Sequence, residues 1–134
     1  MTSLNGSCLC GSVALTVQDQ FVYAGYCHCS RCRKASGAAG VAIGGIPKKL
    51  FEITRGAEFL ARHQRSEATD SYFCGRCGST LYGEKPLTGM VHVRYGVLDE
   101  QPTLAPQAHM HVASKAGWYE ITDSLPQFAT FPPS

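Results

Sequence analysis

The sequence Cys-Gly-Arg-Cys-Gly at residues 74–78 decides the fold, because two cysteines three positions apart can wrap one metal ion through a tight turn. Glycine after the second cysteine permits a positive φ, which lets backbone N–H groups point at sulfur. The sequence Cys-Leu-Cys-Gly at residues 8–11 ends in the same Cys-Gly pair. We therefore predict that both segments contribute to one structural zinc site, with four ligands: Cys8, Cys10, Cys74 and Cys77.

A third cluster, Cys-His-Cys-Ser-Arg-Cys at residues 27–32, supplies the remaining three of the seven cysteines. A structural zinc takes four protein ligands, whereas a reactive zinc usually takes three and leaves one position for water or substrate. We therefore predict two zinc ions per chain, with Cys27, Cys29 and Cys32 as the ligands of a catalytic ion.

Positive charge surrounds the three-cysteine cluster, since Arg31 lies inside it and Arg33 and Lys34 follow it. Positive neighbours lower the pKa of a thiol and favour the reactive thiolate. These side chains could also attract an anionic thiol such as glutathione, which carries more carboxylate than amine charge. The alternative is that they are ordinary solvated surface charges.

The Cys-x-Cys spacing also predicts local backbone geometry. Residues i and i+2 of an extended strand lie roughly 6.6 Å apart, whereas two sulfurs on one tetrahedral zinc lie roughly 3.7 Å apart. The backbone at Leu9 and at His28 should therefore leave regular strand geometry.

A histidine could support the three-cysteine site. His28 lies between two ligands and should point away from the metal, while His109 and His111 share one face of a possible strand. Most lone histidines are surface or hydrogen-bonded residues. We take His109 as the best candidate for a role near the substrate.

The length of the chain predicts one zinc-binding domain over residues 1–134, since it matches the usual size of a single domain. Lys and Arg number 12 against 10 Asp and Glu, with no run of like charge, which argues against nucleic acid as a partner.

The first residues lack signal-peptide features, and no apolar stretch is long enough to cross a membrane. We expect a cytoplasmic protein, where thiols stay reduced or bind metal; a disulfide framework fits an odd cysteine count poorly.

Short alternating or apolar runs separated by Gly, Pro and Asn predict a mainly β chain. One helical turn is expected over residues 30–36, with Ser30 as a possible N-cap. Aromatic residues, Trp118 among them, are expected in the core. Expected strands are residues 11–17, 41–46, 51–54, 58–61, 71–74 and 90–97, with weaker candidates at 109–112 and 118–121.

Four motifs together resemble the glutathione-dependent formaldehyde-activating enzyme family, which is similar to the zinc domain of centromere protein V. The resemblance runs from about residue 7 to 128, followed by an irregular tail at 129–134. The motifs are Cys8-x-Cys10-Gly11-Ser12-Val13, Cys27-His28-Cys29-x-x-Cys32-Arg33-Lys34-x-x-Gly37, Phe73-Cys74-x-x-Cys77-Gly78-Ser79 and His109-x-His111-Val112-x-Ser114-Lys115-x-x-Trp118.

The resemblance implies a β-tent of several small antiparallel sheets and the same two ligand sets. It also implies an S-(hydroxymethyl)glutathione synthase-like activity of the carbon–sulfur lyase class, with glutathione or another small thiol as partner. The chain is shorter than the family members for which that activity is named. A non-catalytic zinc-binding module, or a carrier of thiol or formaldehyde, is therefore the alternative, and the oligomeric state is left open.

Overall fold

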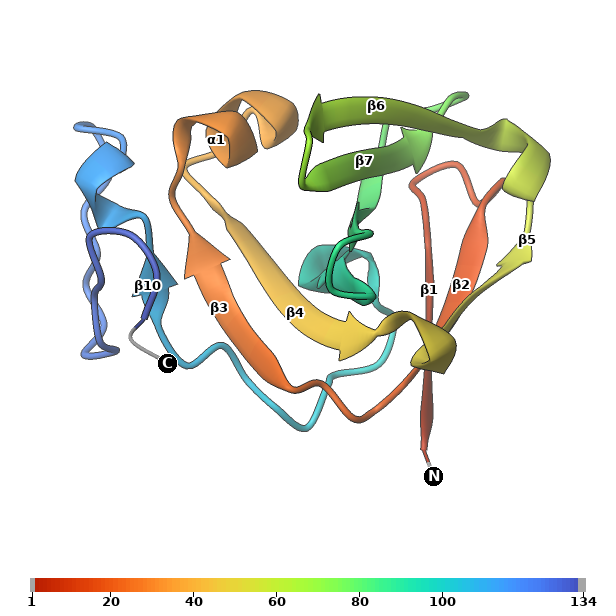
Figure 1. Cartoon of the computed structure of the whole chain (residues 1–134), viewed down its shortest axis with the longest axis horizontal. Coiled ribbons are helices and arrows are strands. Elements are labelled where there is room, and N and C mark those ends of the chain that lie inside the picture. The colour runs from red at the N-terminus through yellow and green to blue at the C-terminus, as the bar shows by residue number, and fades with distance from the viewer. Residues whose placement is uncertain (1, 133–134) are drawn as a thin grey trace.

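A computed structural model describes residues 2–132 and confirms a mainly β chain (Figure 1). The expected helix is present as α1 (Ser30–Ser36), and ten strands accompany it. They are β1 (Ser3–Ser7), β2 (Ala14–Gln18), β3 (Tyr23–Cys27), β4 (Val41–Pro47), β5 (Phe51–Arg55), β6 (Leu60–Ser66), β7 (Thr69–Cys74), β8 (Thr80–Lys85), β9 (Met90–Arg94) and β10 (His109–Met110). Short 3-10 turns occupy 48–50, 57–59, 95–97 and 112–114.

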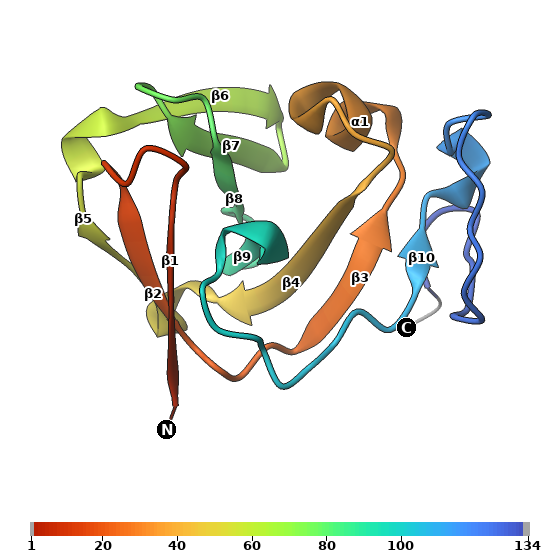
Figure 2. The same cartoon turned by 180° about the vertical axis from the view of Figure 1, so that it is seen from behind.

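The strands form two sheets. One contains β1, β2 and β5, and the other has the order β10-β3-β4-β9-β8-β7-β6. All named pairs are antiparallel except β10 with β3, where residues 109–110 run parallel to residues 26–27. Figure 2 shows how β9 and β8 continue the sheet from β4 toward β7.

The larger sheet has one face against the core and one face toward a cavity, because side chains alternate along a strand. In β9, Val91 and Val93 are buried in the core, while His92 and Arg94 line the cavity. Leu15 and Val17 of the smaller sheet belong to the same core cluster. The core therefore holds the two sheets together and leaves the other face available for polar side chains.

The helix α1 lies between the β6–β7 hairpin and the C-terminal segment in both views (Figure 1 and Figure 2). Its N-cap is Cys29, not Ser30, since the Cys29 sulfur accepts a hydrogen bond from the backbone N–H of Cys32 at 3.3 Å. Gly37 ends the helix with a φ of 67°. A predicted metal ligand thus also caps the helix that carries another ligand.

Several further sequence expectations need correction. Residues 11–13 are bends before β2, residues 57–59 and 95–97 are 3-10 turns, and β10 ends at Met110, so His109 and His111 do not share a strand face. Residues 118–121 are a turn followed by irregular chain rather than a strand, and Trp118 is 76% exposed rather than part of the core. The bends expected at Leu9 and His28 are confirmed, since Leu9 lies in a turn and β3 ends before His28.

Candidate functional site

Four cysteine sulfurs meet where the β1–β2 connection approaches the β7–β8 turn. Cys8, Cys10, Cys74 and Cys77 each place a sulfur within 4.8 Å of the others. The Cys8–Cys10 and Cys10–Cys74 sulfur separations are 3.6 and 3.9 Å. These values match the roughly 3.7 Å edge expected for a tetrahedral zinc thiolate. The four residues can therefore hold one metal ion.

The glycines after each cysteine pair adopt the positive φ that the motif requires. Gly11 has a φ of 78° and Gly78 a φ of 82°. The backbone N–H of Val13 donates to the Cys8 sulfur at 3.3 Å, and that of Arg76 donates to the Cys74 sulfur at 3.4 Å. Hydrogen bonds of this kind stabilise thiolates, and they explain how a chain can gather four of them.

The other three cysteines form a second group at the end of β3 and the start of α1. The sulfurs of Cys27, Cys29 and Cys32 also lie within 4.8 Å of one another. Cys27 and Cys32 are buried, and Cys29 is partly exposed. All seven cysteines lie within the described residues, and none of them forms a disulfide. The division into a four-sulfur and a three-sulfur group is therefore present in the fold.

Hydrogen bonding within the three-cysteine group favours one thiolate. The pKa of the Cys32 thiol is lowered to about 4, mainly by the contact with Cys27 and also by the charges of Arg94 and Arg65. The same contact raises the pKa of Cys27. A deprotonated sulfur is the form that binds metal, so the surroundings of Cys32 favour a ligand.

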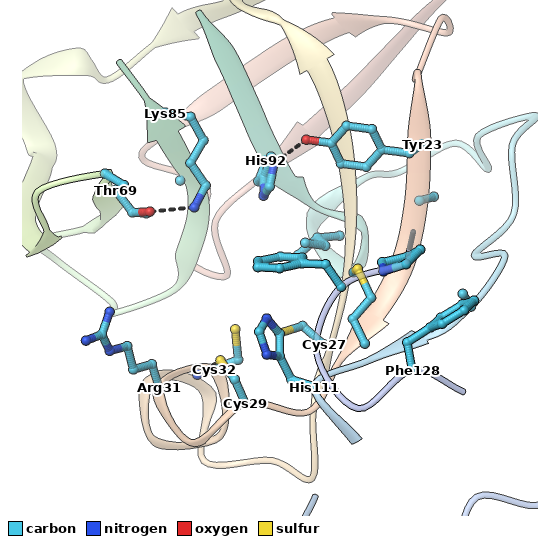
Figure 3. A pocket seen from close by; sticks show the side chains of 18 of the residues that line it. Tyr23, Cys27, Cys29, Arg31, Cys32, Thr69, Lys85, His92, His111 and Phe128 are labelled. Carbon is cyan, nitrogen blue, oxygen red and sulfur yellow. Dashed lines mark hydrogen bonds between the residues drawn. The ribbon is translucent and has the colours of Figure 1, made fainter. Parts of the chain in front are cut away.

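The three sulfurs open into a cavity of about 1020 Å³ on the face of the larger sheet that carries His92 and Arg94 (Figure 3). The opposite wall carries Thr69 and Lys85, and a third side carries Tyr23 and His92. The four-sulfur group does not line this cavity. The incomplete ligand set is thus the one with access to a small molecule.

Tyr23 and His92 form a hydrogen-bonded pair on the cavity wall, with Tyr23 Oη and His92 Nε2 2.5 Å apart. Tyr23, Gly45 and His92 lie in one row across β3, β4 and β9. A Cβ at Gly45 would lie 2.2 Å from the Tyr23 ring. Glycine at this position therefore lets the tyrosine ring cross β4 and reach the histidine.

His111 also lines the cavity, and Figure 3 shows its ring on the same side as the cysteines. Among residues 2–132 it is the only non-glycine residue with a positive φ, 56°. A left-handed conformation in a histidine is unusual and is often found at functional sites. Its ring packs edge-on against Phe131, with centroids 4.6 Å apart.

Only one of the three cationic residues expected to bind the substrate lies in the cavity. Arg31 lines the cavity, whereas Arg33 and Lys34 do not. Three other cations line it instead: Arg65, Lys85 and Arg94. They are far apart in sequence and reach one cavity only through the pairing of β6 to β9. Alternation in residues 90–94 was the one sequence signal that placed Arg94 on a shared face with His92.

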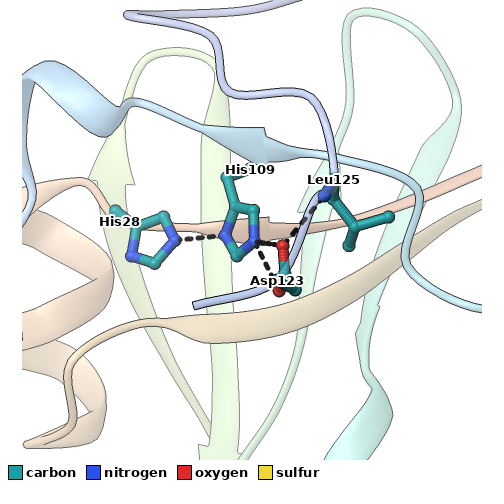
Figure 4. A network of polar contacts seen from close by, with 4 residues as sticks. All are labelled: His28, His109, Asp123 and Leu125. Carbon is teal, nitrogen blue, oxygen red and sulfur yellow. Dashed lines mark hydrogen bonds and ion pairs between the residues drawn. The ribbon is translucent and has the colours of Figure 1, made fainter. Parts of the chain in front are cut away.

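His109 lies behind the three-cysteine loop and does not line the cavity. It is 2% exposed, and its Nε2 contacts both carboxylate oxygens of Asp123 at 3.0 Å (Figure 4). Its Nδ1 lies 2.8 Å from His28 Nε2. Because a carboxylate only accepts, His109 Nε2 donates to Asp123, and neutral His109 then accepts from His28. The network holds the residue between Cys27 and Cys29 from the side away from the cavity.

Comparison with known proteins gives the family. The model of the glutathione-dependent formaldehyde-activating enzyme family matches residues 3–114. The chain belongs to that family. The match covers both cysteine groups and the strands that carry the cavity wall.

Curated relatives extend over most of this chain. A Fusarium vanettenii protein is 32% identical over 130 residues, covering 92% of this chain and 59% of its own length. An Aspergillus flavus protein is 28% identical and is covered over 58% of its length. Both carry the family's enzyme name as a provisional one. This chain therefore spans about three-fifths of the length of these family members.

A solved structure supports the fold. The crystal structure of a Rhodobacter sphaeroides protein superposes with a TM-score of 0.60 at 24% identity, covering 71% of this chain and 87% of the other. Within residues 2–132, no helix has the length and apolar character needed to cross a membrane.

The burial of His92 leads to a prediction about pH. The pKa of His92 is lowered to about 4, mainly by burial and also by the positive charges of Lys85 and Arg94. In the unfolded chain this histidine has a pKa near 6.5. Between a pH of about 6.5 and about 4, the unfolded chain therefore binds a proton at His92 that the folded chain does not bind. We expect His92 to lower the free energy of unfolding by about 3 kcal/mol as pH drops from about 6.5 to about 4.

The measurement is an NMR titration of the His92 ring, with the exposed His63 as internal reference. Denaturant unfolding at several pH values should also show a weaker pH dependence for His92→Gln than for the parent chain. Acid release of metal affects both proteins, so the difference between them isolates the histidine. A His92 midpoint above 6 would contradict the prediction.

Proposed function

We propose that this protein is a zinc-dependent enzyme of the carbon–sulfur lyase type, acting on the adduct of an aldehyde with glutathione or another small thiol. One observation carries the proposal: the incomplete group of three cysteines opens into the cavity, while the complete group of four does not. The family match supports formaldehyde as the aldehyde and glutathione as the thiol. Free thiols throughout the described chain support a reducing compartment such as the cytoplasm.

Both cysteine groups fit zinc by the chemistry of their donors, since thiolates at such spacings are the usual ligands of tetrahedral zinc. Cys8, Cys10, Cys74 and Cys77 would hold a structural ion. Cys27, Cys29 and Cys32 would hold a second ion. A metal ion held there would supply a coordination position that lowers the pKa of a bound thiol.

The residues of the cavity then have separate tasks in the reaction. A C–S bond forms between the substrate sulfur and the aldehyde carbon, and the carbonyl oxygen gains the proton that the thiol lost. The reverse reaction breaks that C–S bond and returns the proton to sulfur. Tyr23 and His92 form a neutral hydrogen-bonding pair in the same cavity, and we assign this proton exchange to them.

The experiment that tests the proposal begins with metal content. A reduced preparation should contain two zinc ions per chain, of which a mild chelator removes one, because three-thiolate binding leaves a labile position. Cobalt restored at the exchangeable site should then show a changed sulfur-to-metal absorption when glutathione is added. Exchange between formaldehyde, glutathione and their adduct, followed by NMR, should be faster with the protein than without it.

Three results would discriminate among the functions. Faster exchange together with the cobalt change supports the enzyme. Stoichiometric thiol binding without faster exchange indicates a carrier. A single zinc ion, or no absorption change at millimolar glutathione, would reject the proposed thiol site.

A further inference from the structure

Three cationic side chains of the larger sheet line the cavity. Arg65 comes from the end of β6, Lys85 from the end of β8 and Arg94 from the end of β9. Arg65 and Lys85 lie at the same end of the sheet, because Gln64 pairs with Asp70, Asp70 pairs with Glu84, and Lys85 follows Glu84. Arg94 lies four residues along β9 from Met90, the partner of Lys85, and also lines the cavity.

This positive charge is not neutralised within the described chain. None of the described residues that line the cavity is Asp or Glu. The ion pairs of neighbouring strands lie elsewhere: Arg62 pairs with Asp70 at 3.5 Å and Lys48 with Glu84 at 2.7 Å. Three thiolates with one divalent ion carry one net negative charge. Four lining cations, with Arg31 included, therefore leave the cavity positive.

Two of these guanidinium groups have buried nitrogens without a hydrogen-bond partner in the described chain: Nη2 of Arg65 and Nη1 of Arg94. A buried cationic donor left unpaired is unfavourable, so such atoms indicate where an acceptor belongs. Nη1 of Arg65, in contrast, already donates to the Cys32 sulfur at 3.8 Å. One guanidinium thus touches the sulfur group and also offers a free nitrogen beside it.

Lys85 completes the wall. Its Nζ donates to Thr69 Oγ1 at 2.5 Å, which directs the amine into the cavity (Figure 3). An ammonium group has three N–H donors, so this contact leaves capacity for an anionic acceptor. Burial lowers the pKa of Lys85, and the neighbouring Arg65 lowers it further. An anion placed between the two side chains would relieve this repulsion.

We propose that Arg65, Lys85 and Arg94 form a subsite for a carboxylate, and that the substrate is a small thiol carrying that carboxylate a few bonds from its sulfur. The short separation follows from Arg65, whose guanidinium contacts the sulfur group and the subsite at once. Guanidinium groups bind carboxylates with paired, charge-assisted hydrogen bonds. This inference rests on the proposed function, because it names the group by which the same site recognises its thiol.

The test compares thiols that share a sulfur and differ in charge. Binding of 3-mercaptopropionate, 2-mercaptoethanol and cysteamine to the zinc-loaded protein is measured by calorimetry. We expect 3-mercaptopropionate to bind about 10–100-fold more tightly than 2-mercaptoethanol, and cysteamine more weakly than either. The preference should shrink as salt is raised.

Two single variants locate the subsite. Lys85→Gln and Arg94→Gln should each lower the ratio of the affinity for 3-mercaptopropionate to the affinity for 2-mercaptoethanol about tenfold. Arg62→Gln is the matched control, because Arg62 lies on the same hairpin as Arg65 but pairs with Asp70 outside the cavity. Metal content and circular dichroism of each variant show whether the sites and fold persist. If Lys85→Gln loses the fold, Arg94→Gln decides.

Propionate, a ligand without sulfur, tests the carboxylate subsite separately from the proposed thiol site. Propionate that binds as tightly as 3-mercaptopropionate, with no cobalt absorption change for any thiol, would keep the carboxylate subsite and reject the thiol site. Equal affinity for 3-mercaptopropionate and 2-mercaptoethanol, with the cobalt change present, would reject the subsite and keep the thiol site.

Discussion

The variant Cys74→Ser is expected not to fold. Cys74 is 0% exposed, and its sulfur lies in the group that joins the β1–β2 connection to the β7–β8 turn. Structural zinc in a four-thiolate site contributes roughly 10–16 kcal/mol of apparent binding free energy in peptide models, and a whole domain is stable by only about 5–15 kcal/mol. Loss of one ligand therefore removes stabilisation of the same order as the total.

Circular dichroism, the dispersion of amide NMR signals and soluble yield measure this effect. Cys29→Ser serves as the comparison, since it removes one sulfur from the other group and should leave a folded chain. A cooperative unfolding transition for Cys74→Ser near that of the parent chain, with Cys29→Ser unfolded, would reverse the assignment of the two groups.

The second large effect concerns Cys29→Ser itself. This variant should retain one zinc ion and lose the exchangeable one. The rate at which it exchanges formaldehyde adducts should be at least about 100-fold lower than that of the parent chain, because the proposed catalysis would depend on a bound metal. Metal analysis and NMR exchange rates measure the two losses together. Ala35→Ser is the matched control, as it adds the same hydroxyl to the exposed side of α1 away from the sulfurs.

Retention of both zinc ions in Cys29→Ser would show that Cys29 is not a ligand. Loss of the ion with undiminished exchange would show instead that the metal is not needed for the reaction. The proposed function requires that the two losses occur together.

Much of the metal chemistry could be predicted from sequence, because it depends on neighbours along the chain. Gly11 and Gly78 identified the cysteine pairs that share a site, and both have the expected positive φ. The helix at residues 30–36 followed from its own residues, although its cap proved to be a cysteine.

The cavity could not be predicted in this way, because it depends on pairing between distant strands. β1, β3 and β8 were not expected, and β8 supplies Lys85. Arg65 and Arg94 reach the same cavity only once β6 to β9 adopt their register. Expectations based on sequence proximity therefore favoured Arg33 and Lys34, which lie outside the cavity.

The parallel pairing of β10 with β3 has a consequence for the order in which the protein assembles. The four-cysteine group is complete by residue 77, whereas the cavity needs residues 109–110 beside residues 26–27 and a further wall from Pro126 and Phe128. Contacts between such distant residues form late, since the chain must close a long loop to make them. During synthesis on the ribosome, we therefore expect a nascent chain that already binds its structural metal while its thiol pocket is still open on one side.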